Sequence, residues 1–205
     1  MVTYWSVPPM WVGRTVAVMA SGPSMSQEVA DKVRAARLPA IAVNNTYRLA
    51  PWADLLYAAD EEWWNVNRHV PAEFPGLKVS VSSVAGVMRL CNTGPEGFDD
   101  DRSCVRTGKH SGYQAVHIAA HTGAKRIILC GFDMKGGHWH AEHERPLRTT
   151  DRDLYPIWAK RFDLLATELA KRGIEVVNTS IGSAITAFKF MPIAEACAQA
   201  QADAK

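Results

Sequence analysis

The chain has 205 residues, of which 47% are hydrophobic and 21% are charged, values that are ordinary for one compact globular domain. Its 23 Lys and Arg residues nearly balance its 21 Asp and Glu residues, so the formal net charge of +2 provides no global attraction to nucleic acid or to a membrane surface. No segment approaches the roughly 20 apolar residues of a membrane-spanning helix, and the N-terminus lacks the pattern of a signal peptide. We therefore expect a single cytoplasmic domain over residues 1–205, with no membrane span.

The four cysteines are Cys91, Cys104, Cys130 and Cys197, and they form no CxxC pair and no zinc-ribbon spacing. Cys130 lies in an apolar run and is expected to pack as a small hydrophobic residue. Cys91 and Cys104 flank a loop and could pair, but free thiols in a reducing cytosol are the favoured interpretation.

The N-terminal half of the chain alternates short apolar runs with helical patterns. Residues 1–13 are rich in aromatic residues and proline and are expected to be an irregular lead-in. Apolar residues at helical spacing follow Ser24, which predicts a helix that Ser24 or Ser26 can cap. The predicted elements of this half are strands over 15–20, 40–43, 55–59 and 77–81 and helices over 24–37 and 61–69.

The C-terminal half contains two predicted loops, over residues 92–109 and over the histidine-rich residues 134–152. A long amphipathic helix over 153–172 follows, with Ile157 and Phe162 among the residues predicted to face the core. The other predicted elements are a helix over 110–122, strands over 126–130 and 174–177, and a terminal helix or tail over 192–205.

Strands alternate with helices nearly throughout, which predicts an α/β fold with a mostly parallel, Rossmann-like three-layer sheet and helices on both faces. In such sheets ligands bind beyond the carboxyl ends of the strands. Polar residues and turn residues collect at those ends of the predicted strands: Ser21, Gly22, Pro23 and Ser24, then Asn44 and Asn45, then Asp60, Asp133 and Asn178.

The turn Ser21-Gly22-Pro23-Ser24 joins a predicted buried strand to a predicted helix. Gly22 lets a ligand approach the backbone, Pro23 suits a helix entrance, and Ser24 offers a hydroxyl. Free N–H groups and the helix dipole favour an anion such as a phosphate there. The turn matches neither GxGxxG nor a Walker loop, and a tight turn without a ligand is an equally weighted alternative.

Three histidines, His138, His140 and His143, share the loop that follows Asp133. Histidine titrates near neutrality, so one of them can accept a proton from an attacking hydroxyl or contact a substrate, which is the favoured interpretation. A solvated loop is the second interpretation, and a metal site that includes Asp133 is the third.

Basic residues lie near both predicted anion sites. Lys109 and His110 precede a predicted helix and could neutralise a phosphate, and the arginines that follow the histidine loop, including Arg152, could clamp one. A solvated helix face explains the arginines nearly as well.

Four motifs carry a resemblance to a known group of proteins. They lie between residues 16 and 188 and read, in chain order, "VAVMASGPSM", "IAVNNTYRL", "KHSGYQAVHIAAHTGAKRIILCGFDM" and "GIEVVNTSIGSAITAF". Together they resemble Rossmann-like proteins that include the bacterial CMP-sialic-acid sialyltransferases, the Maf-type flagellin-glycosylation proteins and the archaeal 6-hydroxymethylpterin diphosphokinase-like proteins. The order and spacing of the motifs carry the resemblance, because each motif alone is weak.

The resemblance implies roles for several residues. Gly22, Pro23 and Ser24 would contact the nucleotide phosphates or sugar, and Asn44 or Asn45 would help hold the nucleotide or the donor sugar. Ser111 and Gly112 would open a helix that forms a second anion site in the same cleft, and Asp133 would lie near the substrate. Ser21, Asp60 and Asn178 complete the set of nucleotide-binding candidates.

The first functional hypothesis is a nucleotide-sugar-dependent glycosyltransferase that moves a sugar to a hydroxyl acceptor. The Maf-like segment favours His140 as its general base, helped by Asp133, with His138 as a further catalytic candidate and no metal. A second hypothesis is an ATP-dependent pyrophosphokinase, which alone would require Mg²⁺, with Asp60 and Asp133 as ligands. A third is a non-catalytic nucleotide-binding protein. The sequence is compatible with a homo-oligomer and does not specify the sugar or the acceptor.

The glycine turn yields one further expectation. A bulky side chain at Gly22, as in Gly22→Val, should abolish nucleotide binding and leave the melting temperature nearly unchanged, because the turn lies between a buried strand and a helix N-terminus where a phosphate or ribose is expected to bind.

Overall fold

The computed structural model describes residues 3–141, 147 and 151–203, which form an α/β fold around an eight-stranded sheet. All strand pairs of this sheet are parallel, in the order β10-β9-β8-β1-β2-β3-β4-β5. The predicted fold class is confirmed. The strands of the main sheet are β1 Thr15–Met19, β2 Ala40–Val43, β3 Leu55–Tyr57, β4 Leu77–Ser80, β5 Met88–Arg89, β8 Arg126–Cys130, β9 Glu175–Asn178 and β10 Lys189–Phe190.

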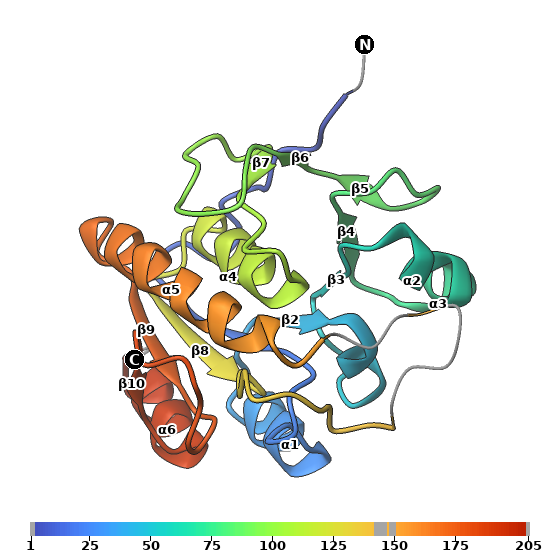
Figure 1. Ribbon diagram of the computed structural model, residues 1–205. Coiled ribbons are helices and arrows are strands. Elements are labelled where there is room, and N and C mark those ends of the chain that lie inside the picture. The colour runs from blue at the N-terminus through green and yellow to red at the C-terminus, as the bar shows by residue number, and fades with distance from the viewer. Residues whose placement is uncertain (1–2, 142–146, 148–150, 204–205) are drawn as a thin grey trace.

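Helices cover both faces of the sheet (Figure 1). Helices α4 and α5 pack on one face and α1 and α6 on the other, where α2 and α3 also contribute to the core. Their bounds are α1 Gln27–Ala35, α2 Glu61–Val66, α3 Val70–Glu73, α4 Ser111–His121, α5 Leu154–Lys171 and α6 Ile193–Asp203, with a 3-10 helix η1 at Asn44–Arg48. None of these helices combines the length and hydropathy that crossing a membrane requires.

Strand β1 shows how the sequence builds two cores. Val16 and Val18 contribute to the core beneath α4 and α5, whereas Ala17 and Met19 contribute to the core beneath α1 and α6. Successive side chains of a strand point to opposite faces, so a continuous apolar run is what a strand covered on both faces requires. Every residue of β1 is accordingly buried.

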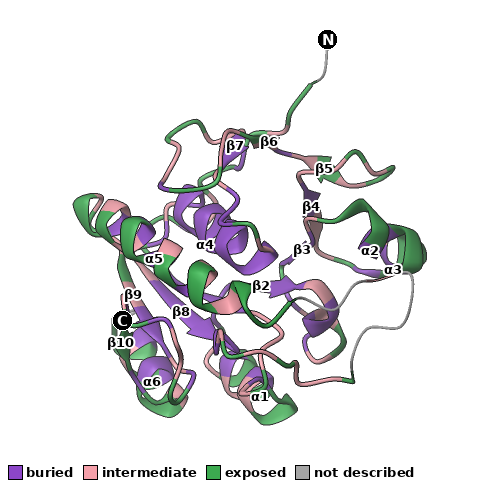
Figure 2. Cartoon of the chain, viewed as in Figure 1, coloured by how far each residue is buried: buried purple, intermediate pink, exposed green. Residues whose placement is uncertain are grey.

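Helix α4 is buried along its whole length, which Figure 2 shows as an almost continuous purple helix. Segments from elsewhere in the chain cover it. Val7 of the lead-in donates a backbone hydrogen bond to Arg102, and Trp11 donates one to Thr122 at the end of the helix. Small residues, Ala and Gly, let the helix pack closely against these neighbours and the sheet.

Some predicted elements differ from the structure. The predicted loop 92–109 contains part of a second, two-stranded parallel sheet, β6 Cys91–Asn92 with β7 Cys104–Val105. The helix predicted from Ser24 begins at Gln27, because Ser26 is its N-cap and accepts a hydrogen bond from the Val29 N–H at 3.3 Å. Ile157 was predicted to face the core but is 52% exposed.

The order of the strands creates a switch point at β1. From β1 the chain crosses to β2 on one side, and β8 lies on the other. The chain leaves β1 for α1 on one face of the sheet and leaves β8 for α5 on the other face, so the two connections diverge. Ligands of open α/β sheets bind in the crevice at such a switch point.

Candidate functional site

A cavity of about 130 Å³ lies at the carboxyl ends of β1, β2 and β8. Its walls come from the turn after β1, the start of η1, the N-terminus of α4, the loop after β8 and the first turns of α5. The predicted site residues Ser21, Gly22, Pro23, Asn44, Ser111, Gly112, Asp133 and His138 line it, together with His110, Gly136, Tyr155 and Trp158. We call this cavity and its open mouth the cleft.

The turns after β1 and β8 are packed against each other at one wall of the cleft. Gly22 donates a backbone hydrogen bond to Gly131 O at 2.9 Å. A Cβ atom at Gly22 would lie 2.2 Å from Asp133 Oδ2 and 2.4 Å from Gly131 O, so no side chain fits there. The glycine is therefore required by the packing of the protein itself, whatever ligand approaches it.

Ser24 joins this packing rather than lining the cleft. Its hydroxyl donates to Asp133 Oδ2 at 2.8 Å, its backbone N–H donates to the same oxygen at 3.2 Å, and its Oγ lies 2.9 Å from Ser180 Oγ. Because α1 begins at Gln27, Pro23 and Ser24 precede the helix instead of forming its first turn. The Ser24 hydroxyl, which the sequence predicts as a ligand contact, thus has internal partners in this structure.

The N-terminus of α4 forms the opposite wall. Its N-cap is His110, whose Nδ1 accepts a hydrogen bond from the Tyr113 N–H at 3.2 Å, so the neutral imidazole carries its proton on Nε2. His110 is half-buried as a residue, but its Nε2 is shielded from solvent and has no hydrogen-bond partner among the described residues. The ring stacks on Trp158 with centroids 5.5 Å apart.

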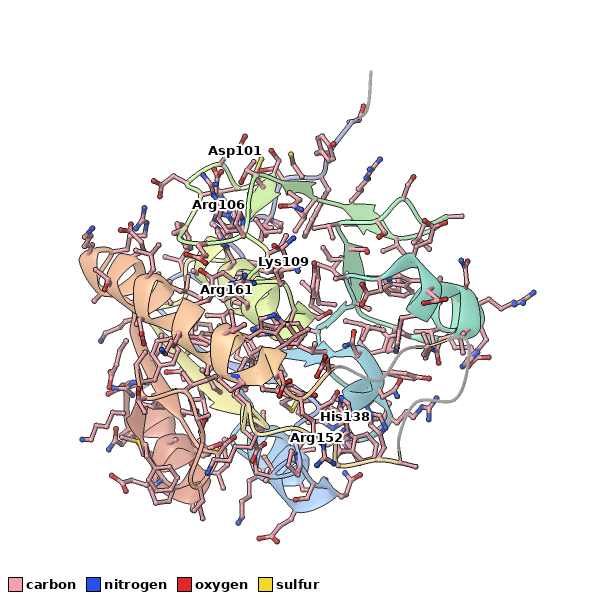
Figure 3. The ribbon with its side chains drawn as sticks, in the orientation of Figure 1. Asp101, Arg106, Lys109, His138, Arg152 and Arg161 are labelled. Carbon is pink, nitrogen blue, oxygen red and sulfur yellow. The ribbon has the colours of Figure 1, made fainter. Side chains whose placement is uncertain are left out.

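His110 is uncharged at neutral pH. Burial lowers its pKa to about 3, and the nearby positive charge of Arg161 adds to the shift. Figure 3 shows Arg161 near Lys109, and its Nη1 donates to the Gly108 carbonyl at 2.9 Å. The imidazole of His110 is thus a neutral group whose only N–H is on Nε2, and it does not carry the positive charge that the sequence suggested.

Asn44 and Asn45 have different surroundings. Asn44 lies in the left-handed region at φ +49°, lines the cleft, and has a buried Oδ1 without a hydrogen-bond partner among the described residues. Asn45 is buried, accepts a hydrogen bond from Trp63 Nε1 at 3.0 Å, and contacts His140 Nε2 at 3.2 Å. Asn44 therefore faces the ligand space, and Asn45 supports the histidine loop.

His138 and His140 lie face to face with ring centroids 5.0 Å apart, and His138 lines the cleft. His140 contacts Asn45 through Nε2 and the Ala141 carbonyl through Nδ1, and burial, with Arg48 adding, lowers its pKa. Asp133 Oδ2 accepts hydrogen bonds from Ser24, and the help that the sequence predicts from Asp133 to His140 stays a prediction. His143 lies outside those residues.

Two further predicted binding residues, Asn178 and Asp60, lie outside the cleft, as Ser24 and Asn45 do. Asn178 is buried, where its Oδ1 accepts from the Ser180 N–H and its Nδ2 donates to the Phe132 carbonyl, so it shapes the turn after β9 and contacts no ligand space. Asp60 lines a neighbouring depression that it shares with Asn44, and burial raises its pKa, with Glu62 adding to the shift.

Tyr155 and Trp158, which line the cleft from the start of α5, were not predicted from the sequence. The sequence feature that could have identified them is their spacing: two aromatic residues three positions apart, at the start of the helix that follows the polar loop, lie on the same helix face. Arg152 lies close by: a Cβ at Gly136 would sit 3.8 Å from Arg152 Cγ and 3.5 Å from Tyr155 Cε2. Figure 3 shows Arg152 and His138 in the same part of the molecule.

No group of three or more His, Cys, Asp or Glu side chains within residues 3–141, 147 and 151–203 is arranged to hold a metal ion. The two acidic residues expected to bind Mg²⁺ in a pyrophosphokinase face different spaces, since Asp133 lines the cleft and Asp60 the depression beside it.

No protein-family model matches the chain, and no curated protein matches it. A solved structure that does match is the sialyltransferase CstII from Campylobacter jejuni, determined in complex with a substrate analogue, cytidine-5'-monophosphate. The two chains are 13% identical with a TM-score of 0.52, and the match covers 90% of this chain and 87% of that one. This similarity establishes a sialyltransferase-like α/β fold, in agreement with the resemblance drawn from the sequence, and it does not extend to the Maf-type or pterin-kinase-like proteins.

Proposed function

We propose that the protein binds a nucleotide sugar in the cleft and transfers the sugar to a hydroxyl acceptor. The observation that carries this proposal is the N-terminus of α4 at the switch point of the sheet. There the neutral His110 N–H, which has no partner among the described residues, lies beside Ser111 and Gly112. Free N–H groups at the start of an 11-residue helix suit an anion such as a phosphate, and open α/β folds bind ligands in the crevice at the switch point.

The walls of the cleft suit the other parts of such a ligand. The unpartnered Asn44 Oδ1 is an acceptor for an amino or hydroxyl group, and Tyr155 and Trp158 offer aromatic surface to a base or sugar. The cavity volume of about 130 Å³ accommodates a phosphate-sized group, so the rest of the nucleotide sugar would extend into the open mouth. The fold shared with a protein that binds cytidine-5'-monophosphate favours a pyrimidine nucleotide.

The chemistry requires a base for the acceptor and stabilisation of the departing nucleotide. We assign the base to the stacked pair of His138 and His140, with His138 nearer the reaction because it lines the cleft. The α4 N-terminus and His110 Nε2–H would stabilise the charge that develops on the leaving phosphate. In this arrangement Asp133 holds the scaffold together and takes no part in proton transfer.

A thermal-shift and calorimetric screen against CMP-, UDP- and GDP-sugars and against ATP with Mg²⁺ tests this function. We expect a pyrimidine nucleotide sugar to raise the melting temperature of the wild-type protein, and the His110→Asn variant to bind it more weakly. A shift with ATP and Mg²⁺ alone would favour the pyrophosphokinase instead. The absence of any shift would leave a non-catalytic protein and contradict the proposal.

A further inference from the structure

The small sheet β6–β7 places two cysteines opposite each other. Cys91 and Cys104 are register partners in the parallel pair, and the Cys91 N–H donates to the Ser103 carbonyl at 2.8 Å. Register partners on neighbouring strands are about 4.8 Å apart and direct their side chains to the same side. That separation falls within the Cα–Cα range of about 4.4 to 6.8 Å that disulfides require.

The two thiols contact each other and differ in access. The Cys104 thiol is buried, and burial together with a hydrogen bond to the Cys91 thiol raises the pKa of Cys104 to about 11. Cys91 is only half-buried, so it is the thiol that a reagent meets first. Cys130 and Cys197 are buried in the core on the other face of the main sheet.

We propose that Cys91 and Cys104 form a reversible disulfide with glutathione disulfide as the oxidant. The Cys91 thiolate attacks glutathione disulfide, forms a mixed disulfide and releases one glutathione thiolate. Cys104, which loses its proton as it attacks, then displaces the second glutathione from Cys91. The net reaction oxidises two protein thiols to one disulfide and reduces one glutathione disulfide to two glutathione molecules.

This disulfide would close the base of a loop that packs against α4. Within the loop, Gly97 N–H donates to Tyr113 Oη and Tyr113 Oη–H donates to Gly97 O, both at 3.0 Å. Farther along, the Gly108 N–H donates to the Pro95 carbonyl at 2.8 Å, two residues before His110. Asp101 and Arg106 mark the loop in Figure 3. The bond would thus brace the segment that leads into α4, and it does not depend on the proposed function.

Mass spectrometry of the native protein in glutathione redox buffers tests the disulfide. We expect oxidation to consume two of the four thiols, remove two hydrogen atoms from the intact mass, and join the peptides that contain Cys91 and Cys104. Dithiothreitol should reverse the change, and the oxidised protein should melt at a higher temperature because its unfolded chain is cross-linked. Four free thiols in glutathione disulfide, or a cross-link that forms only in denaturant, would overturn the proposal.

Two variants separate the steps. Cys104→Ser should stop the reaction at a glutathione adduct on Cys91, because the second thiol is missing. Cys197→Ala is the matched control and should keep the cross-link. A stable glutathione adduct on Cys91 in the wild-type protein would show that Cys104 does not reach the Cys91 sulfur, and it would refute the pairing.

Discussion

Ser24 donates a hydrogen bond from its hydroxyl to Asp133 Oδ2 at 2.8 Å, and its backbone N–H donates to the same oxygen at 3.2 Å. The two residues are 109 positions apart in the chain. Their contact ties the turn after β1 to the turn after β8, and Gly22 lies between the two turns without room for a side chain. The Gly22–Ser24 turn is therefore part of the scaffold that shapes the cleft.

This packing reverses the effect expected of a substitution at Gly22. We now expect Gly22→Ala to lower the free energy of unfolding by about 3 kcal/mol or more, because its Cβ would overlap Asp133 Oδ2 and the Gly131 carbonyl. Gly22→Val should be worse, so it cannot leave the melting temperature unchanged as the sequence suggested. Urea denaturation followed by circular dichroism measures the loss.

Gly137→Ala is the matched control for this prediction. Gly137 also lines the cleft, but a Cβ there meets no atom within 4 Å, and only its φ of +78° opposes a side chain. We expect that variant to lose about 1 to 2 kcal/mol. Equal losses for the two alanine variants would show that the crowding at Gly22 relaxes without cost.

The fold could be predicted from the sequence because its signals are local. Buried apolar runs such as 126–130 and the alanine-rich pattern of α4 are visible in short windows of residues. Strands β6 and β7 were missed because each contains two residues, which is too short to show a period. The late start of α1 was missed because both Ser24 and Ser26 can cap a helix, and a tertiary contact occupies Ser24.

The site could be predicted in position but not in detail. Gly22, Asn44 and Ser111 meet at the cleft, as the rule for the carboxyl ends of parallel strands indicates. The partner of Asp133 could not be predicted, since Ser24 reaches it only once β1 and β8 pair. The same holds for His110, whose unpartnered Nε2 becomes apparent only from the packing of Trp158 and Arg161 around it.

Asn44 provides a second prediction, on ligand binding without a change in stability. Its Oδ1 has no intramolecular partner in the described residues, and its φ of +49° is a conformation that glycine adopts freely. We expect Asn44→Gly to weaken nucleotide binding about 3- to 10-fold, the loss of one hydrogen bond, while the melting temperature stays nearly unchanged. Isothermal titration calorimetry and thermal denaturation on the same samples measure both. A large drop in melting temperature would assign Asn44 to the scaffold.

The histidine loop provides a third prediction. His138→Ala should lower the turnover number by about 10²- to 10⁴-fold with little change in donor affinity, because the variant loses the proposed base at the cleft wall. His140→Ala should have a smaller effect, through the lost contact with Asn45. His69→Ala, at an exposed position before α3, is the control. Full activity in both loop variants would remove the catalytic assignment, and a larger loss in His140→Ala would restore the order predicted from the sequence.

Acid sensitivity follows from His117, which is buried on α4. Its Nδ1 accepts from the Arg106 N–H at 3.3 Å and its ring stacks on Phe98, and burial lowers its pKa from 6.5 to about 3. The unfolded chain therefore takes up the proton first, so this contribution to stability is complete above about pH 6.5 and is lost as the pH falls toward 3.

Between pH 7 and pH 5, one such histidine should cost about 2 kcal/mol of unfolding free energy. Urea denaturation at the two pH values should show at least this loss, since burial shifts the pKa of His110 and of His121 in the same direction. His117→Gln cannot take up the proton, so its loss between the two pH values should be smaller by about 2 kcal/mol. An identical pH dependence in the variant would contradict the assignment to His117.

The last prediction concerns His110, which has two separable functions in the structure. Its Nδ1 caps α4 by accepting from the Tyr113 N–H, and its Nε2–H is the donor that we assign to the ligand phosphate. Asparagine is a favourable N-cap whose side-chain oxygen can replace Nδ1, but it has no group at the position of Nε2. His110→Asn should therefore keep the cap and weaken nucleotide binding about 3- to 10-fold. Its melting temperature should fall modestly, because the ring contacts with Trp158 and Phe162 are lost.

His110→Ala completes the test because it removes both functions. We expect it to lose about 1 kcal/mol of stability with the cap, in addition to the same loss of affinity. The neutral state of His110 also has a signature in binding: with a pKa of about 3, the contribution of this residue to affinity should not change between pH 5 and pH 8. If His110→Asn binds as tightly as the wild type, or if the affinity that it loses depends on pH in that interval, the phosphate does not accept a hydrogen bond from a neutral His110.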